Sequence, residues 1–179
     1  MKRGALLLVV GVLALLFQGA VATEIPARFV PDLGFLMVVA FGVSLRSGVG
    51  GVTLAALLGF VTDLLSGSLL GQHALLRMAA LAATRLFSGR LNLRGVLPQV
   101  IFVTVLSVGD ALALWALAAF FSPGASPGPG IRNGLLAHAL VNGLCAPFVI
   151  AATGRLLNLA GREEAGQRLM RLEPRDWTA

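Results

Sequence analysis

Charged and chemically reactive side chains are scarce in this chain. Only 12% of its 179 residues are charged, whereas 57% are hydrophobic, and the mean hydropathy is +0.88. Soluble domains carry roughly 25% charged residues, so this composition excludes a soluble fold and predicts an integral membrane protein. The chain has no tyrosine, and Cys145 is its only cysteine. An internal disulfide and a thiolate metal cluster are therefore both excluded.

Signatures of common enzymes are also missing. The nucleotide-binding loop G-x-x-x-x-G-K-[ST] does not occur, and neither do the hydrolase motifs G-x-S-x-G and H-E-x-x-H. His73 and His138 lie far apart in the chain, which gives a metal site little support. Asp63 and Asp110 are a possible acid pair, but the Gly-x-Gly-Asp pattern of intramembrane aspartyl proteases is absent. We therefore expect no catalysis, no cofactor and no metal site.

Hydrophobic runs predict an all-α protein, a single bundle of about six transmembrane helices within residues 1–160. A straight spanning helix needs about 20 residues, so the second and fourth runs are short. Each of these two either extends into its flanking loop or lies partly re-entrant. The predicted spans are residues 5–21, 33–45, 49–65, 70–87, 96–121 and 131–159.

The distribution of basic residues predicts the orientation of the bundle. With a cytoplasmic N-terminus, 11 bases fall on the inside and 3 on the outside, as the positive-inside rule expects. Both termini are then cytoplasmic. Bases in short segments between apolar runs suit anionic lipid headgroups better than nucleic acid. The inside set is Lys2, Arg3, Arg46, Arg85, Arg90, Arg94, Arg155, Arg162, Arg168, Arg171 and Arg175, and the outside set is Arg28, Arg77 and Arg132.

Three segments of the chain carry further expectations. Residues 2–22 also resemble a cleavable signal peptide, although an uncleaved first helix is expected in a chain with later spans. The proline- and glycine-rich segment 122–130 is expected to be irregular. Residues 161–179 are a charged cytoplasmic tail, which either forms a short helix on the membrane, docks a partner or stays solvated.

Small residues form a stripe along the third predicted span. Gly51, Ala55, Gly59 and Asp63 follow one another at i+4 spacing, which places them on one helical face. Small residues at this spacing let a neighbouring helix approach closely, either within the bundle or from a partner protein. With Ser66, Gly67 and Gly71 of the following turn, these residues are predicted to serve structure and assembly.

Asp63 is a carboxylate inside apolar sequence, where a charge costs a few kcal/mol or more. A tight hairpin at Ser66-Gly67 would place residues 63 and 72 level and Arg77 about 7–8 Å deeper. A long arginine side chain covers that distance. The sequence therefore predicts an ion pair between Asp63 and Arg77.

Further polar residues are predicted to gather inside the bundle. The topology puts Gln72, His73 and His138 in the outer half and Asp110 and Asn142 near the middle. Such residues are functional candidates in a membrane, but they also form hydrogen-bond networks that fix helix register. The pattern predicts one polar cluster that opens towards the periplasmic side.

Two motifs resemble a known family. Residues 59–75 resemble the signature of the MreD family of rod shape-determining membrane proteins. They read Gly59-x-x-x-Asp-x-x-Ser-Gly-x-x-Leu-Gly-x-x-Ala-Leu75. Upstream, Pro31-Asp32 and the apolar residues after it resemble that family's entry to its second helix. Length, spans and tail extend the resemblance over nearly the whole chain. Gly34 and the segment 122–130 depart from the family pattern.

The resemblance implies a non-catalytic component of the cell-elongation machinery in the bacterial inner membrane. Its implied partners are an MreC-like single-span protein and, indirectly, a RodA-type glycosyltransferase, an elongation penicillin-binding protein and MreB filaments. The implied fold is similar to the six-helix substrate-binding components of energy-coupling vitamin transporters. That similarity leaves an alternative function, a vitamin-type binding component of a membrane transporter.

Overall fold

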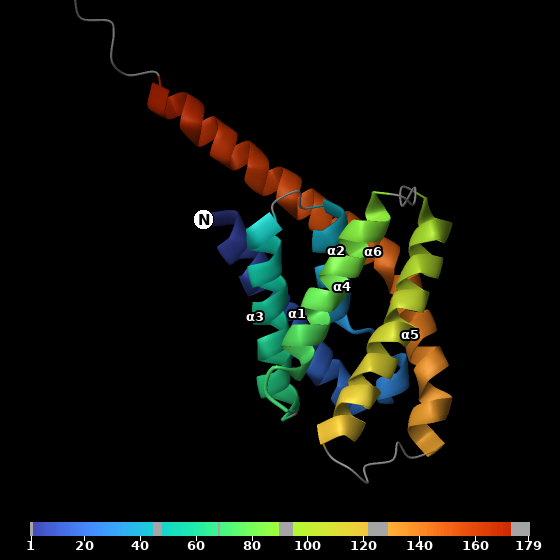
Figure 1. Ribbon diagram of the computed structural model, residues 1–179. Helices are drawn as coiled ribbons and strands as arrows, with labels where there is room; N and C mark the ends of the chain where they lie inside the picture. The colour runs from blue at the N-terminus through green and yellow to red at the C-terminus, as the bar shows by residue number, and fades with distance from the viewer. Residues whose placement is uncertain (1, 45–47, 68, 90–94, 122–128, 173–179) are drawn as a thin grey trace, which may run out of the picture.

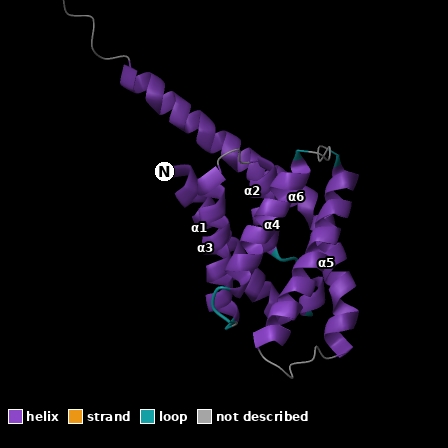
Figure 2. Cartoon of the chain, in the orientation of Figure 1, coloured by secondary structure: helices purple, strands orange, loops and turns teal. Residues whose placement is uncertain are grey.

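The computed structural model describes residues 2–44, 48–67, 69–89, 95–121 and 129–172, with side chains omitted for residues 2, 3, 48, 129–133 and 160–172 (Figure 1). These residues form α-helices and one 3₁₀ turn but no strand, which confirms the predicted all-α class (Figure 2). The helices are α1 (Lys2–Glu24), α2 (Leu33–Ser44), α3 (Gly48–Ser66), α4 (Gln72–Ser88), α5 (Val96–Phe121) and α6 (Pro129–Leu172), and the 3₁₀ turn is η1 (Ala27–Phe29).

The six helices lie at the positions of the six predicted hydrophobic runs. Five segments are long and apolar enough to cross a membrane, so the chain is a multi-pass membrane protein. They are Gly4–Glu24, Ala27–Ser44, Val49–Ser66, Val96–Phe121 and Gly134–Leu159. The exception is α4, which has 17 residues and contains two arginines. It runs back along α3 (Figure 1), and its polar residues Arg77 and Thr84 are buried in the bundle.

The last helix is longer than predicted. Helix α6 runs over 44 residues to Leu172, so the first twelve residues of the predicted tail continue the helix instead of leaving it. The extension projects beyond the bundle at the end where α1 begins (Figure 1). We call this the N-terminal end, and the end with the α3–α4 turn the opposite end. Most of the expected irregular segment, residues 122–128, lies outside the described residues.

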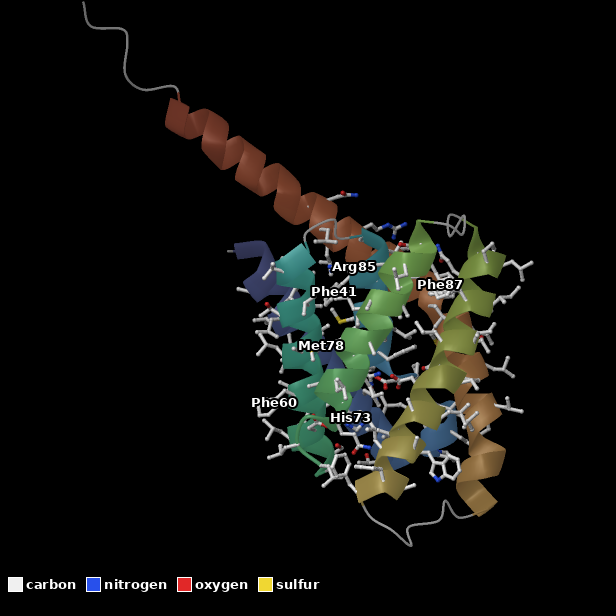
Figure 3. All side chains as sticks on the ribbon, viewed as in Figure 1. Phe41, Phe60, His73, Met78, Arg85 and Phe87 are labelled. Atoms are coloured by element: carbon white, nitrogen blue, oxygen red, sulfur yellow. The ribbon has the colours of Figure 1, made fainter. Side chains whose placement is uncertain are left out.

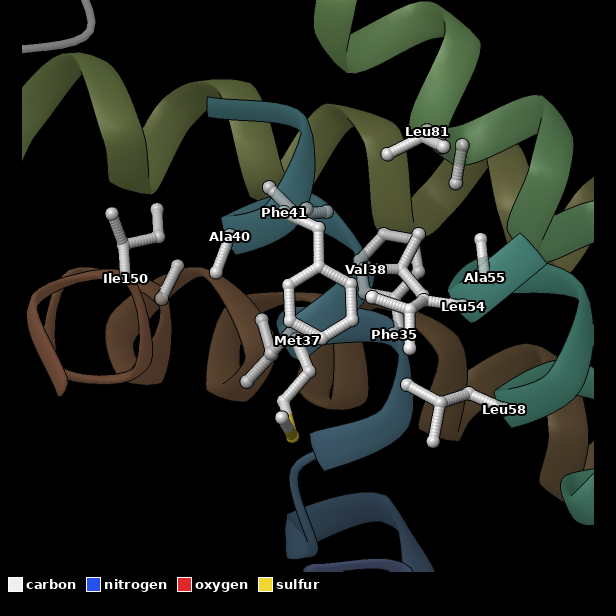
Figure 4. Packing of buried hydrophobic residues seen from close by; sticks show 14 of the residues in the cluster. Phe35, Met37, Val38, Ala40, Phe41, Leu54, Ala55, Leu58, Leu81 and Ile150 are labelled. Carbon is white, nitrogen blue, oxygen red and sulfur yellow. The ribbon is translucent and has the colours of Figure 1, made fainter. Parts of the chain in front are cut away.

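Helix α2 forms the centre of the bundle. All nine residues from Gly34 to Gly42 are buried. A helix that is apolar on every side must be covered all round, and α1, α3, α4 and α6 cover this one. Phe41 belongs to one buried cluster with Leu54 and Leu58 of α3, Leu81 of α4 and Ile150 of α6 (Figure 4). With twelve residues, α2 is only about 18 Å long, which is too short to cross a bilayer alone.

The small-residue stripe of α3 faces α4 within the same chain. A Cβ atom added at Gly59 would clash with backbone atoms of Ala74, and one at Gly51 would clash with the Arg85 guanidinium. Ala55, between them, is fully buried. Of the two partners that the sequence left open, the stripe therefore packs against a helix of its own bundle. This close packing holds α3 and α4 together as a hairpin.

Gly59→Ala is expected to destabilise the protein by about 1–3 kcal/mol, because the new methyl group meets backbone that cannot rotate away. Unfolding of the purified protein in detergent micelles measures the change. Gly19→Ala is the matched control, since nothing lies within 4 Å of a Cβ atom there. Equal stability of the two variants would contradict this account of the hairpin.

Candidate functional site

The site is built around the start of α2, halfway through the bundle. Asp32 precedes the helix, and its Oδ1 accepts a hydrogen bond of 2.8 Å from the backbone N–H of Phe35. This is the usual N-cap bond from an aspartate to the third helical residue. The cap is needed because the first N–H groups of a helix have no partner within it, and the bilayer core holds no water that could bond to them.

Arg77 of α4 joins this carboxylate to α5. Its Nη2 donates to Asp32 Oδ2 at 2.5 Å, and its Nη1 donates to Asp110 Oδ2 at 3.2 Å. The guanidinium also lies 5.2 Å from the centroid of the Phe35 ring, a cation–π distance. The Arg77 side chain is only 1% exposed, so its charge depends on these neighbours for compensation.

Two amide side chains complete the connections around the start of α2. Asn142 of α6 accepts a 2.7 Å hydrogen bond from the backbone N–H of Asp32 and donates to Ser107 Oγ of α5 at 2.9 Å. Gln18 of α1 accepts a 2.8 Å hydrogen bond from the backbone N–H of Leu33. One helix start therefore bonds directly to α1, α4 and α6, and it is linked to α5 through Arg77 and Asn142. We call Gln18, Asp32, Arg77, Ser107, Asp110 and Asn142 the polar network.

Asp63 is not the partner of Arg77, and the predicted ion pair between them is wrong. Its carboxylate accepts hydrogen bonds from the backbone N–H groups of Gly71 and His73, both at 2.9 Å, and from His73 Nδ1 at 2.8 Å. The N–H of Ala74 approaches the same carboxylate at 3.4 Å. Asp63 therefore caps the start of α4 from the end of α3. Several N–H groups satisfy this carboxylate without a guanidinium.

The faces of α4 explain the different partner. Ala74 and Arg85 lie on the side of α4 that meets α3. Thr84 lies on the side that meets α2, where a Cβ atom added at Gly42 would clash with it. Arg77 shares the side of Thr84, because seven residues make nearly two turns. Its side chain therefore reaches the start of α2 and not the end of α3.

The turn between α3 and α4 depends on two glycines. Gly67 has φ +63° and Gly71 has φ +92°, values that residues with a Cβ rarely adopt. Ser66 ends α3 with a weak 3.4 Å bond from its hydroxyl to the Asp63 carbonyl. The turn places Gly71 and His73 against Asp63. The predicted turn residues and Asp63 therefore form one local structure, which positions the start of α4.

The two histidines lie at the edges of the polar network. His73 is near the opposite end of α4, away from Arg85 and Phe87 at the N-terminal end (Figure 3). His73 is close enough to Asp110, and His138 to Asp32, for electrostatic interaction. Gln72 donates a 3.1 Å hydrogen bond to the Leu114 carbonyl and so adds a second link from α4 to α5.

The sequence named Arg77, Asp110, His138 and Asn142, but it did not predict that Arg77 and Asn142 both bond to Asp32. Asp32 was assigned to the entry of the second span, outside the polar cluster. The available signal was an aspartate directly before an apolar helical run, which is a typical N-cap pattern. Gln18, the only strongly polar side chain of the first span, was not linked to it.

The arrangement holds helices together. No group of three or more metal-ligating side chains occurs among the residues that the structure describes. The carboxylates are instead engaged with helix N–H groups and one guanidinium. Such a network fixes the relative positions of five helices, since each contributes at least one hydrogen bond to it or to the start of α2.

A protein-family model matches about two thirds of the chain. The family model of the rod shape-determining protein MreD matches residues 3–121. The matched region contains α1 to α5 with Asp32, Asp63, Arg77 and Asp110, while α6 with Asn142 lies outside it. No curated protein and no solved structure matched the chain.

Double-mutant cycles distinguish the two possible partners of Arg77. Removing one partner of a buried ion pair typically costs about 3–5 kcal/mol, so Arg77→Met alone should be strongly destabilising. Combined with Asp32→Asn, the effects should be non-additive by about 0.5–3 kcal/mol, as for residues in contact. Combined with Asp63→Asn, they should add to within about 0.5 kcal/mol. A coupling energy that is larger for Asp63 than for Asp32 would overturn the assignment.

Proposed function

Because the chain belongs to the MreD family of rod shape-determining proteins, we propose that it is a non-catalytic scaffold of the cell-elongation machinery in the bacterial inner membrane. Its role in rod shape determination follows from the family. In the proposed mechanism, the bundle is a rigid platform that positions partner proteins of lateral peptidoglycan synthesis. The observation that carries this proposal is the family match over residues 3–121, from α1 to the end of α5.

The use of the polar groups supports a scaffold more than an enzyme. Asp32, Asp63 and Arg77 all bond to helix starts or to each other. A catalytic acid or base must instead be within hydrogen-bond reach of a substrate atom. The alternative function, a vitamin-type binding component, gains no support from the family match.

The proposed direct partner is an MreC-like protein with a single transmembrane span. Many large apolar side chains face outward from α1 and α5, including Leu13, Phe17, Val105 and Phe120. A partner helix can pack on such a surface by van der Waals contact, which is the main source of helix association in lipid. Through that partner the scaffold would connect to a RodA-type glycosyltransferase, an elongation penicillin-binding protein and MreB filaments.

Depletion of the protein should turn rod-shaped cells into spheres. Re-expression of the wild-type chain or of Gly19→Ala should restore rods, whereas Arg77→Met should not, because it breaks the polar network. Cell shape by microscopy and membrane levels by immunoblot are the measurements. In the same cells, reciprocal purification should recover the MreC-like protein with the wild-type chain. Unchanged cell shape on depletion, together with lost uptake of one vitamin, would instead favour the transporter component.

The proposed orientation places the N-terminal end of the bundle in the cytoplasm. It rests on the distribution of basic residues, with 11 on the cytoplasmic side and 3 on the outer side. A fluorescent-protein fusion after residue 179 should therefore fluoresce, because that reporter matures in the cytoplasm. Alkaline phosphatase inserted after residue 125 should be active, because it folds only in the periplasm. The opposite pattern of the two reporters would reject this topology.

A further inference from the structure

Two carboxylates in the polar network share a single guanidinium, but they are bonded unequally. Asp32 uses both oxygens: Oδ2 accepts from Arg77 Nη2 at 2.5 Å and Oδ1 accepts from the Phe35 N–H at 2.8 Å. Asp110 accepts one hydrogen bond of 3.2 Å from Arg77. Within the described part of the chain, its second oxygen has no hydrogen-bond partner.

The helix context adds to this difference. Asp32 is at the N-terminus of α2, where the helix dipole favours a negative charge. Asp110 is inside α5, between Val96 and Phe121, where the dipole gives no such support. Arg77 does not chelate either carboxylate side-on, because its Nε has no hydrogen-bond partner even though the atom is buried. The positive charge of Arg77 therefore compensates mainly the carboxylate of Asp32.

Apart from Arg77, no charged group of the described residues neutralises Asp110 by direct contact. Arg77 and His73 approach it from α4, Asp32 lies at the start of α2, and His138 of α6 lies near Asp32. The Nδ1 atom of His73 is bonded to Asp63 at 2.8 Å. With both aspartates ionised, two negative charges would face one guanidinium in the middle of a membrane bundle. Two neighbouring carboxylates favour the protonation of one of them.

We infer that Asp110 is a proton-binding site and holds a proton on its second oxygen while Arg77 and Asp32 form the ionised pair. The protonated carboxyl keeps Oδ2 as the acceptor for Arg77 Nη1. The Asp110 side chain is 16% exposed, so its second oxygen has room for a proton. Loss of the proton leaves an uncompensated negative charge at the contact between α4 and α5. The contact between α4 and α5 is therefore stable at neutral pH, where Asp110 is protonated, and becomes less stable as the pH rises and the proton is lost.

Infrared spectroscopy tests the protonation state directly, without reference to cell shape. The full chain is purified in a detergent that has no ester carbonyls, at neutral pH. We expect a C=O stretch from a protonated carboxyl group that shifts when the aspartate side-chain carboxyls carry ¹³C. This band should be lost in Asp110→Asn. It should persist in Glu24→Gln, the control, because Glu24 is an exposed residue outside the network.

Asp32→Asn provides an independent variant. Without Asp32, the guanidinium belongs to Asp110 alone, which should then ionise and lose the band although its own side chain is unchanged. An isotope-sensitive band in the wild-type chain that disappears in both variants supports the proposal. If the variants fail to fold, the labelled wild-type chain still tests the proposal, since it must show the band of a protonated aspartate. The absence of an aspartate C=O band at neutral pH, or its persistence in folded Asp110→Asn, overturns the inference.

Discussion

The start of α2 in the middle of the bundle is the constraint on which the rest of the structure depends. A helix that begins there leaves backbone N–H groups unpaired where no bulk water reaches them. The Asp32 carboxylate and the amides of Gln18 and Asn142 satisfy three N–H groups at this start. The carboxylate in turn needs a positive charge, and Arg77 supplies it. The start of one helix inside the bundle therefore accounts for a polar residue on each of three neighbouring helices, α1, α4 and α6.

This network gives the central helix a unique position that its apolar surface does not specify. Residues Gly34 to Gly42 are buried on all sides, so rotation of α2 by one residue would still bury hydrophobic side chains. Between helices in lipid there is little hydrophobic driving force to select one rotation over another. Buried ion pairs often add no net stability relative to apolar residues of similar volume, but they discriminate against other arrangements. The hydrogen bonds of Asp32 and Arg77 are thus best understood as determinants of register.

Hydrophobic runs and i+4 spacing were enough to predict the helices and the stripe of α3, because both are local properties of the chain. The partners of Arg77 were not predictable in this way. Asp63 is nearer to Arg77 in sequence, but its carboxylate is occupied by the first N–H groups of α4. Asp32 is 45 positions away and was assigned to a connecting segment, since the sequence does not reveal that α2 begins halfway through the bundle. The depth of a helix start depends on the packing of all its neighbours.

The two aspartates near helix starts share one physical role. Asp32 caps its own helix, and Asp63 caps a helix that follows it in the chain, where Gly71 offers no side chain for the purpose. Asp32 and Asp63 therefore each mark a helix start in this protein. The proposed scaffold directs these polar groups inward and presents an apolar outer surface, on which a partner helix could pack. Asp110, bonded at one oxygen only, is the carboxylate of the network that retains capacity for something other than assembly.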